Sequence, residues 1–135
     1  MDTAEVIYLG EFRCEATHLQ SGSKIITDAP TDNFGKGEAF SPTDLMAMSL
    51  ASCIMTTIAI QTRLIGFDLI NSKLTVKKHM ASDPRRVAKI SVDVKIPKGN
   101  LTDEDKEKII TIGLNCPVAK SLHPDLVQDI NFQFV

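Results

Sequence analysis

The chain has no tryptophan, a single tyrosine and a net charge of only −2, so the usual signals of nucleic-acid binding are weak or missing. Recognition of nucleic acid needs clustered lysine and arginine, often with aromatic side chains between them. Neither a basic run nor such interleaving occurs, and we expect no nucleic-acid partner. Residues 1–5 lack the positive and apolar regions of a secretory signal, so we expect a cytoplasmic protein.

Cysteine is also scarce, and the three that occur are widely spaced: Cys14, Cys53 and Cys116. An odd number at such spacing argues against a structural disulfide framework and favours a reduced compartment with one or two working thiols. The sequence has no CxxC motif, and no Cys/His spacing resembles a zinc site. We therefore expect neither a metal nor a bound organic cofactor.

Charge is missing from one long stretch, residues 45–62, which is 18 residues long. The residues before it are typical of a helix start. Ser41 can cap free N–H groups, Pro42 suits the first helical position, and Asp44 adds negative charge to the first turn. Apolar residues fall on every side of the helical wheel. We therefore expect a central helix that is buried all round.

A lipid bilayer is the alternative surrounding for this helix, because 18 residues reach the lower limit of a membrane span. However, six residues of the stretch are polar: Ser49, Ser52, Thr56, Thr57, Gln61 and Thr62. The flanks also lack a Trp/Tyr belt and a basic cluster. The composition favours a core helix, and we expect no membrane association.

Alternating apolar and polar residues predict strands on both sides of this helix. The expected elements are strands 6–12, 13–18 and 23–28, a hairpin of strands 69–80 and 87–96, a helix from Thr102 to about Leu114, a short helix 115–122 with Asn115 as its cap, and a last strand 127–135. This order predicts one α+β domain, residues 1–135, with antiparallel sheets wrapped around the central helix. One chain of this length offers little cover for so apolar a helix, so we expect a homodimer that shares its core.

The two later cysteines differ in their predicted surroundings. Cys116 lies just inside a predicted helix N-terminus, before Pro117, where free N–H groups and the helix dipole favour a thiolate. Cys53 has no charged neighbour in the sequence, so any activation must come from a residue that folding brings near. Both thiols could equally be small buried hydrophobic residues, as free cysteines often are.

The run Ser41-Pro42-Thr43-Asp44-Leu45, followed by Ser52-Cys53 and later by Cys116-Pro117-Val118, resembles the OsmC/Ohr family of thiol peroxidases. The turn at Ser21-Gly22 and the segment Thr27-Asp28-Ala29-Pro30 resemble that family as well. The resemblance covers nearly the whole chain. It implies an intertwined homodimer with active sites at its interface. In such a site Cys53 attacks a hydroperoxide, Cys116 resolves the product as a disulfide, and an external dithiol reduces it.

A buried thiolate needs a cation nearby, both to lower its pKa and to stabilise the leaving alkoxide. Family members use an arginine from the N-terminal strands, and this position falls on Arg13. Arg13 could instead be a surface residue paired with Glu11 or Glu15. The dedicated organic hydroperoxide enzymes carry a glutamate where this chain has Thr43. This difference places the chain closer to the OsmC-like branch. The carboxylate that orients the arginine would then be Asp44 or Glu15.

The predicted function is therefore a cysteine-based peroxidase of oxidative or osmotic stress defence, with Cys53, Cys116, Arg13 and Asp44 as its catalytic residues. One alternative is a non-catalytic protein that binds a small molecule in an apolar pocket at the dimer interface. Another is a stress-related interaction protein in which the cysteines are inert.

Overall fold

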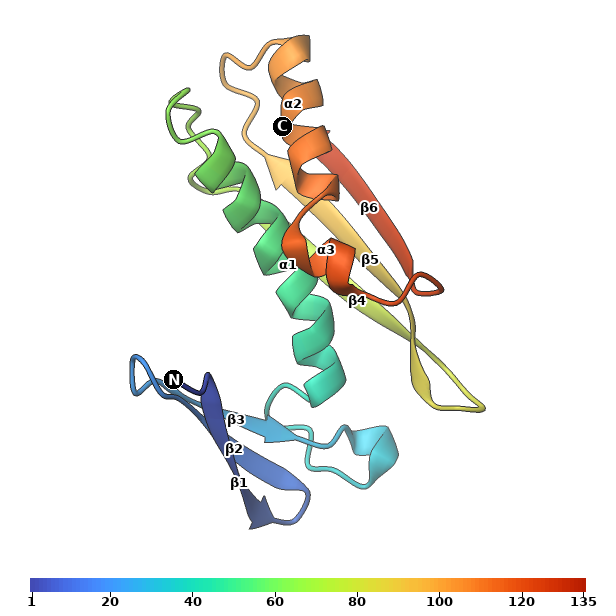
Figure 1. Ribbon diagram of the computed structural model, residues 1–135. Coiled ribbons are helices and arrows are strands. Elements are labelled where there is room, and N and C mark those ends of the chain that lie inside the picture. The colour runs from blue at the N-terminus through green and yellow to red at the C-terminus, as the bar shows by residue number, and fades with distance from the viewer. The chain divides into compact units, whose positions relative to one another are not determined.

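The computed structural model describes all 135 residues, which form two compact units, Met1–Met46 and Ala47–Val135. The first unit contains a three-stranded sheet and the start of the long helix α1 (Pro42–Gln61). The second contains the rest of α1, another three-stranded sheet and two further helices (Figure 1). The mixed α+β class is confirmed, whereas the single domain 1–135 stays a prediction.

The first unit is an antiparallel meander of β1 (Ala4–Gly10), β2 (Arg13–His18) and β3 (Lys24–Asp28), in that order. All three strands were expected, but β1 ends at Gly10 rather than at residue 12. Glu11 and Phe12 both have positive φ, 52° and 62°, and this conformation belongs to a tight hairpin turn rather than to a strand.

Helix α1 begins where the sequence predicts. The Ser41 hydroxyl accepts a hydrogen bond from the Asp44 N–H at 3.0 Å, and the Asp44 carboxylate accepts one from the Ser41 N–H at 2.9 Å. This reciprocal pair is a capping box, which satisfies two N–H groups that the first turn leaves free. Gly66, at φ 86°, lies in the turn that follows the helix.

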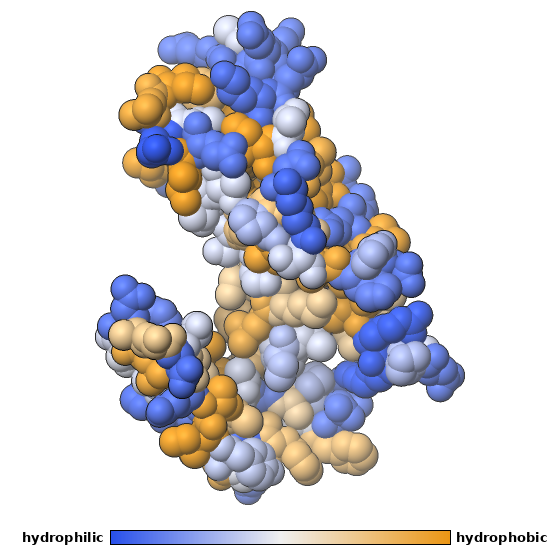
Figure 2. All heavy atoms as spheres, viewed as in Figure 1, coloured by the Kyte–Doolittle hydropathy of each residue, from blue (hydrophilic) through white to orange (hydrophobic).

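Within one chain, α1 is buried on one face only, so the prediction of burial all round is wrong for the chain alone. The buried residues are Ala47, Leu50, Ala51, Ile54 and Ile58. Ile60 is 54% exposed, and Leu64, which follows the helix, is 90% exposed. Figure 2 shows hydrophobic residues, in orange, at the molecular surface. By length and composition alone α1 could cross a membrane, but a core helix passes the same test.

The second sheet has the order β4-β5-β6 and comprises β4 (Lys73–Ala81), β5 (Arg86–Ile96) and β6 (Val127–Phe134). β4 and β5 form the predicted antiparallel hairpin. β6 pairs parallel to β5, so the expectation of purely antiparallel sheets is wrong. The cause is the helical connection between β5 and β6, because a chain that crosses over through helices can return in the same direction.

That connection consists of α2 (Asp103–Leu114) and α3 (Pro117–Ser121). Thr102 and Asp105 form a second capping box, which confirms the predicted start of α2. Asn115 is the C-cap of α2 rather than the N-cap of α3. α2 approaches α1 and β6 closely at Gly113, where an added Cβ would meet side-chain atoms of Ile54, Ile58 and Phe132.

Candidate active site

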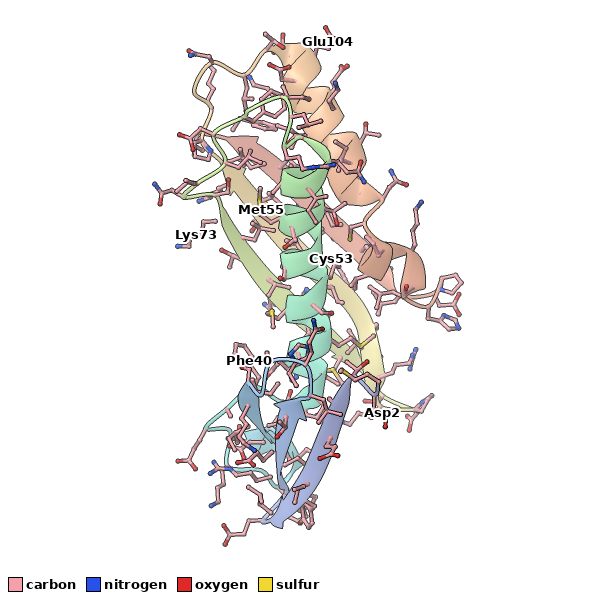
Figure 3. The ribbon with its side chains drawn as sticks, turned by 60° about the vertical axis from the view of Figure 1, so that its left-hand side comes forward. Asp2, Phe40, Cys53, Met55, Lys73 and Glu104 are labelled. Carbon is pink, nitrogen blue, oxygen red and sulfur yellow. The ribbon has the colours of Figure 1, made fainter.

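Cys53 lies midway along α1, where Figure 3 labels it. Its successor Ile54 is fully buried and its predecessor Ser52 is exposed. The helical phase therefore places Cys53 at the border of the buried face, and its side chain is half-buried. A thiol at this border is held by a rigid helix and can still be reached from outside.

Cys116 is the N-cap of α3, and not a residue just inside that helix as the sequence suggested. Its backbone is extended, with φ −69° and ψ 156°, and Pro117 follows in the first turn. The sulfur accepts a hydrogen bond from the Ala119 N–H at 3.4 Å, the role that a hydroxyl or carboxylate oxygen usually plays in a cap. The residue is fully buried.

The start of α3 brings these two cysteines together. The Cys116 thiol hydrogen-bonds to the sulfur of Cys53. The Val118 N–H also donates to the Cys53 sulfur, and the Thr57 hydroxyl oxygen lies 3.7 Å from it. Two sulfurs far apart in the sequence are therefore adjacent in the fold, as a thiol–disulfide couple requires.

The surroundings shift the pKa values of the two thiols in opposite directions. Burial raises the pKa of Cys53, but hydrogen bonds from the Val118 N–H and from the Thr57 and Cys116 side chains outweigh burial and lower it overall. Burial is also the largest influence on Cys116 and raises its pKa. The Ala119 N–H lowers that pKa in part, while the hydrogen bond to Cys53 and the charge on Cys53 raise it further. Deprotonation of the pair therefore yields a Cys53 thiolate beside a protonated Cys116.

Arg13 lies in the N-terminal unit, within a cluster of carboxylates. Its Nε donates to Oδ1 of Asp28 at 2.7 Å, and its Nη2 donates to Oδ2 of Asp28 at 2.9 Å and to Glu38 at 3.2 Å. Asp28 is almost fully buried, and Arg13 holds the pKa of this carboxyl below its ordinary value. The hydrogen bond to Asp28 in turn raises the pKa of Arg13. The guanidinium is therefore a fixed positive charge with a defined orientation.

The carboxylates that the sequence offered for Arg13 have other partners. Glu11 pairs with Lys36 at 2.6 Å, and Glu15 lies 3.4 Å from Lys24. The pairing of Arg13 with Glu11 or Glu15 is therefore wrong. Asp44 completes the capping box of α1. The catalytic roles of Arg13 and Asp44 stay predictions.

Sequence reasoning missed Thr57, Val118 and Asp28. Thr57 lies four positions after Cys53, so its place on the same helix face was readable from the spacing. The Val118 contact needs the tertiary fold. Asp28 faces Arg13 because these two residues are paired in the β2–β3 register, which a sequence alone leaves open.

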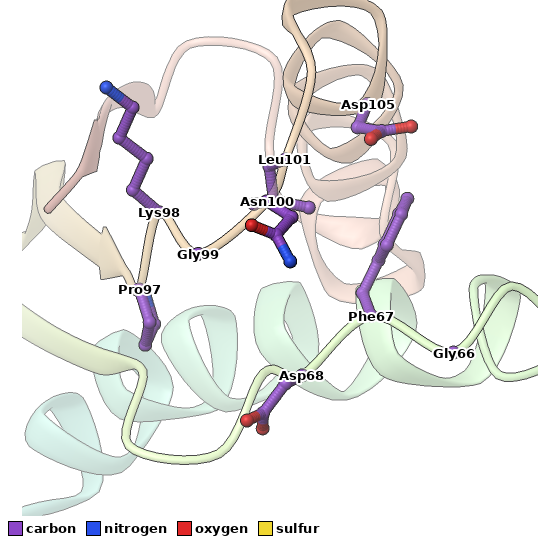
Figure 4. Close-up of a pocket in the computed structure, with 9 residues that line it drawn as sticks. All are labelled: Gly66, Phe67, Asp68, Pro97, Lys98, Gly99, Asn100, Leu101 and Asp105. Atoms are coloured by element: carbon purple, nitrogen blue, oxygen red, sulfur yellow. The ribbon is translucent and has the colours of Figure 1, made fainter.

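A separate pocket of about 380 Å³ lies between the turn after α1 and the loop before α2 (Figure 4). Phe67, Lys98 and Asn100 are among the residues that line it, and neither cysteine is. Its two carboxylates already accept backbone hydrogen bonds, Asp68 from Ile70 and Asp105 from Thr102.

No group of three His, Cys, Asp or Glu side chains in the structure could hold a metal ion.

Comparison with known proteins shows which family the chain belongs to. Residues 35–130 match the model of the family described as OsmC-like protein. A protein from Psychrobacter arcticus, assigned provisionally to osmotic stress induction and the detoxification response, is 47% identical, with 98% of this chain and 96% of that chain covered and a TM-score of 0.93. No curated protein matches.

More distant solved structures share the fold. An OsmC-like protein from Mycoplasma pneumoniae is 18% identical, with 98% of this chain and 95% of that chain covered and a TM-score of 0.80. An organic hydroperoxide resistance protein OsmC from Legionella pneumophila is 15% identical, with 98% of each chain covered and a TM-score of 0.74. Identity at this level shows the fold alone, whereas the family match and the 47% identical structure show the family. The chain belongs to the OsmC-like proteins.

Proposed function

We propose that the chain is a cysteine-based peroxidase that reduces hydroperoxides through Cys53 and Cys116. The Cys53 thiolate attacks the outer oxygen of the peroxide, the O–O bond breaks, and the leaving alkoxide takes a proton to become an alcohol. Cys53 is thereby oxidised to a sulfenic acid. The Cys116 thiol then attacks this sulfur, a disulfide forms and water leaves. An external dithiol reduces the disulfide and restores both thiols.

The observation that carries this proposal is the hydrogen-bonded pair of thiols with opposite pKa shifts. A peroxidase needs its attacking sulfur as a thiolate and its resolving sulfur within reach. The lowered pKa of Cys53 favours the first requirement, and the contact of Cys116 with Cys53 supports the second. Membership of a family that contains organic hydroperoxide resistance proteins agrees with this chemistry.

The remaining parts of the proposal concern the assembly. We infer a homodimer, because the apolar residues exposed on α1 and β1 need cover that one chain lacks; they include Val6, Ile7 and Ile60. In that dimer Arg13, oriented by Asp28 and Glu38, supplies the positive charge for the peroxide oxygens. A reduced cytoplasm would supply the external dithiol. Light scattering coupled to gel filtration tests the dimer directly, and a monomer would refute it.

Thiol titration before and after cumene hydroperoxide tests the chemistry. We expect the reduced protein to lose two thiols per chain and to regain both with dithiothreitol. Cys53→Ser should abolish the loss. Cys116→Ser should stop at a sulfenic acid and lose one thiol. Cys14→Ser is the matched control, because it removes a cysteine outside the pair and should still lose two.

Two results would refute the peroxidase. One is an unchanged thiol count at excess peroxide. The other is equal, slow alkylation of all three cysteines at neutral pH, which would leave the inert or purely ligand-binding alternatives. Peptide-resolved alkylation should instead modify Cys53 at lower pH than Cys116, because only a thiolate reacts.

A further inference from the structure

Two side chains hydrogen-bond to the Cys53 sulfur: the thiol of Cys116 and the hydroxyl of Thr57. Thr57 follows Cys53 by one turn of α1, and both residues are half-buried. Residues four apart on a helix lie on the same face, so the 3.7 Å between Thr57 Oγ1 and Cys53 Sγ follows from the helix itself. This contact does not depend on a mobile loop.

A threonine inside a helix usually returns its hydroxyl proton to the carbonyl four residues before it. Thr62, further along the chain, does so, with its Oγ1 donating to the Ile58 carbonyl at 2.8 Å. At Thr57 the hydroxyl also faces a sulfur. A hydroxyl has one proton to donate, and a charged acceptor makes the stronger bond. The Thr57 proton should therefore go to the sulfur once Cys53 is ionised.

This donor is specific to one of the two cysteines. The sulfur of Cys116 receives its hydrogen bonds from the N–H groups at the start of α3, and Thr57 does not contribute to it. We propose that Thr57 is a positioning residue that holds the Cys53 sulfur as a hydrogen-bonded thiolate and so makes Cys53, rather than Cys116, the attacking thiol. The inference rests on the proposed function for its catalytic meaning, but the hydrogen bond can be tested without any peroxide.

Three variants of the full chain separate the hydroxyl from other effects. Thr57→Val keeps the shape and removes the hydroxyl, and Thr57→Ser keeps the hydroxyl and removes the methyl group. Thr56→Val makes the same change at the neighbouring exposed position of α1 and is the matched control. The measurement is the rate of iodoacetamide alkylation of each cysteine across pH, resolved by peptide mass spectrometry, with Cys14 as an internal reference.

We expect Thr57→Val to move the alkylation profile of Cys53 to higher pH and to slow the reaction about fivefold near pH 7, since a tenfold change corresponds to one pKa unit. The rate at the alkaline plateau should not fall. Thr57→Ser and Thr56→Val should follow the unchanged protein. Circular dichroism should show the same helix content and melting temperature for all, which excludes unfolding as the cause.

The inference is wrong if the Cys53 profile of Thr57→Val coincides with that of Thr56→Val. It is also wrong if Thr57→Ser shifts the profile as far as Thr57→Val, because the methyl group would then be responsible. A shifted profile in a protein that consumes no peroxide would sustain the hydrogen bond and refute only the peroxidase. A peroxidase with an unshifted profile would refute only the role of Thr57.

Discussion

Gly113 lies where α2 crosses the helix that carries Cys53, so its replacement by alanine tests both the packing and the site. The added Cβ would lie 2.9 Å from Phe132 Cζ, 3.1 Å from Ile58 Cδ1 and 3.2 Å from Ile54 Cγ2. Gly113 is not among the residues with positive φ, so the backbone itself would accept alanine. The whole cost must come from the crowded side chains.

Two opposing contributions set the magnitude. Alanine in place of glycine inside a helix stabilises it by about 1 kcal/mol. Overfilling a packed core costs about 1–3 kcal/mol. The two nearest atoms are the outer ends of Phe132 and Ile58, which can shift, but the Ile54 methyl is attached to Cβ on a rigid helix. We therefore take a packing cost of about 2 kcal/mol, near the middle of its range, and subtract the gain in helix propensity of about 1 kcal/mol. Gly113→Ala should then lower the free energy of unfolding by about 1 kcal/mol.

Urea denaturation followed by circular dichroism measures this change. With a slope of about 2 kcal/mol per M, the midpoint should fall by about 0.5 M. Thr111→Ala, on the exposed side of α2, is the control and should raise the midpoint slightly through helix propensity alone. A Gly113→Ala protein that is more stable than the unchanged chain would refute the packing argument. Because Ile54 adjoins Cys53, alkylation of Cys53 should also change in Gly113→Ala and not in Thr111→Ala.

Three further changes have definite expected results. Cys116→Ala removes the cap of α3 and should cost about 1 kcal/mol in urea denaturation, whereas Cys116→Ser keeps a capping atom and should cost less. Thr102→Ala removes the cap of α2 and should cost about 1 kcal/mol by the same measurement. Asp28→Asn should remove a pH-dependent stabilisation by Arg13. Because Asp28 has its pKa lowered on folding, that stabilisation is present above the ordinary value of 3.8 and is lost as pH falls below it. The melting temperatures of the unchanged chain and Asp28→Asn should therefore converge in acid, and a constant difference would contradict the ion pair.

Local signals predicted most of the elements. The capping residues Ser41 and Thr102 determine the starts of α1 and α2, and alternating residues determine the β4–β5 hairpin. These features depend on neighbours within a few positions, and the sequence displays such neighbours directly. The pairing of β6 with β5 is different, because it depends on where two helices return the chain. The alternation of β6 is the same for a parallel and an antiparallel partner.

The candidate site also has features that the sequence predicted and features that only the fold reveals. The resemblance predicted that Cys53 and Cys116 act together, and in the fold their thiols are in contact. The resemblance assigned the attack to Cys53, but the residues alone did not show which thiol ionises first, because Cys53 has no charged neighbour in the sequence. The sequence pointed to Cys116 as the thiol favoured by a helix N-terminus. In the structure the N–H groups of that terminus also reach the other sulfur.

The capping role of Cys116 explains this reversal. Because Cys116 is the N-cap itself, its sulfur shares the start of α3 with the sulfur of Cys53, and the Val118 N–H donates to Cys53. Full burial then favours the neutral form of Cys116, and its thiol proton becomes a further donor to its partner. The short helix that Cys116 caps therefore stabilises a negative charge on Cys53. The contributions of Val118 and Cys116 depend on a tertiary contact between α3 and α1, and for that reason they follow from the fold and not from either cysteine's place in the sequence.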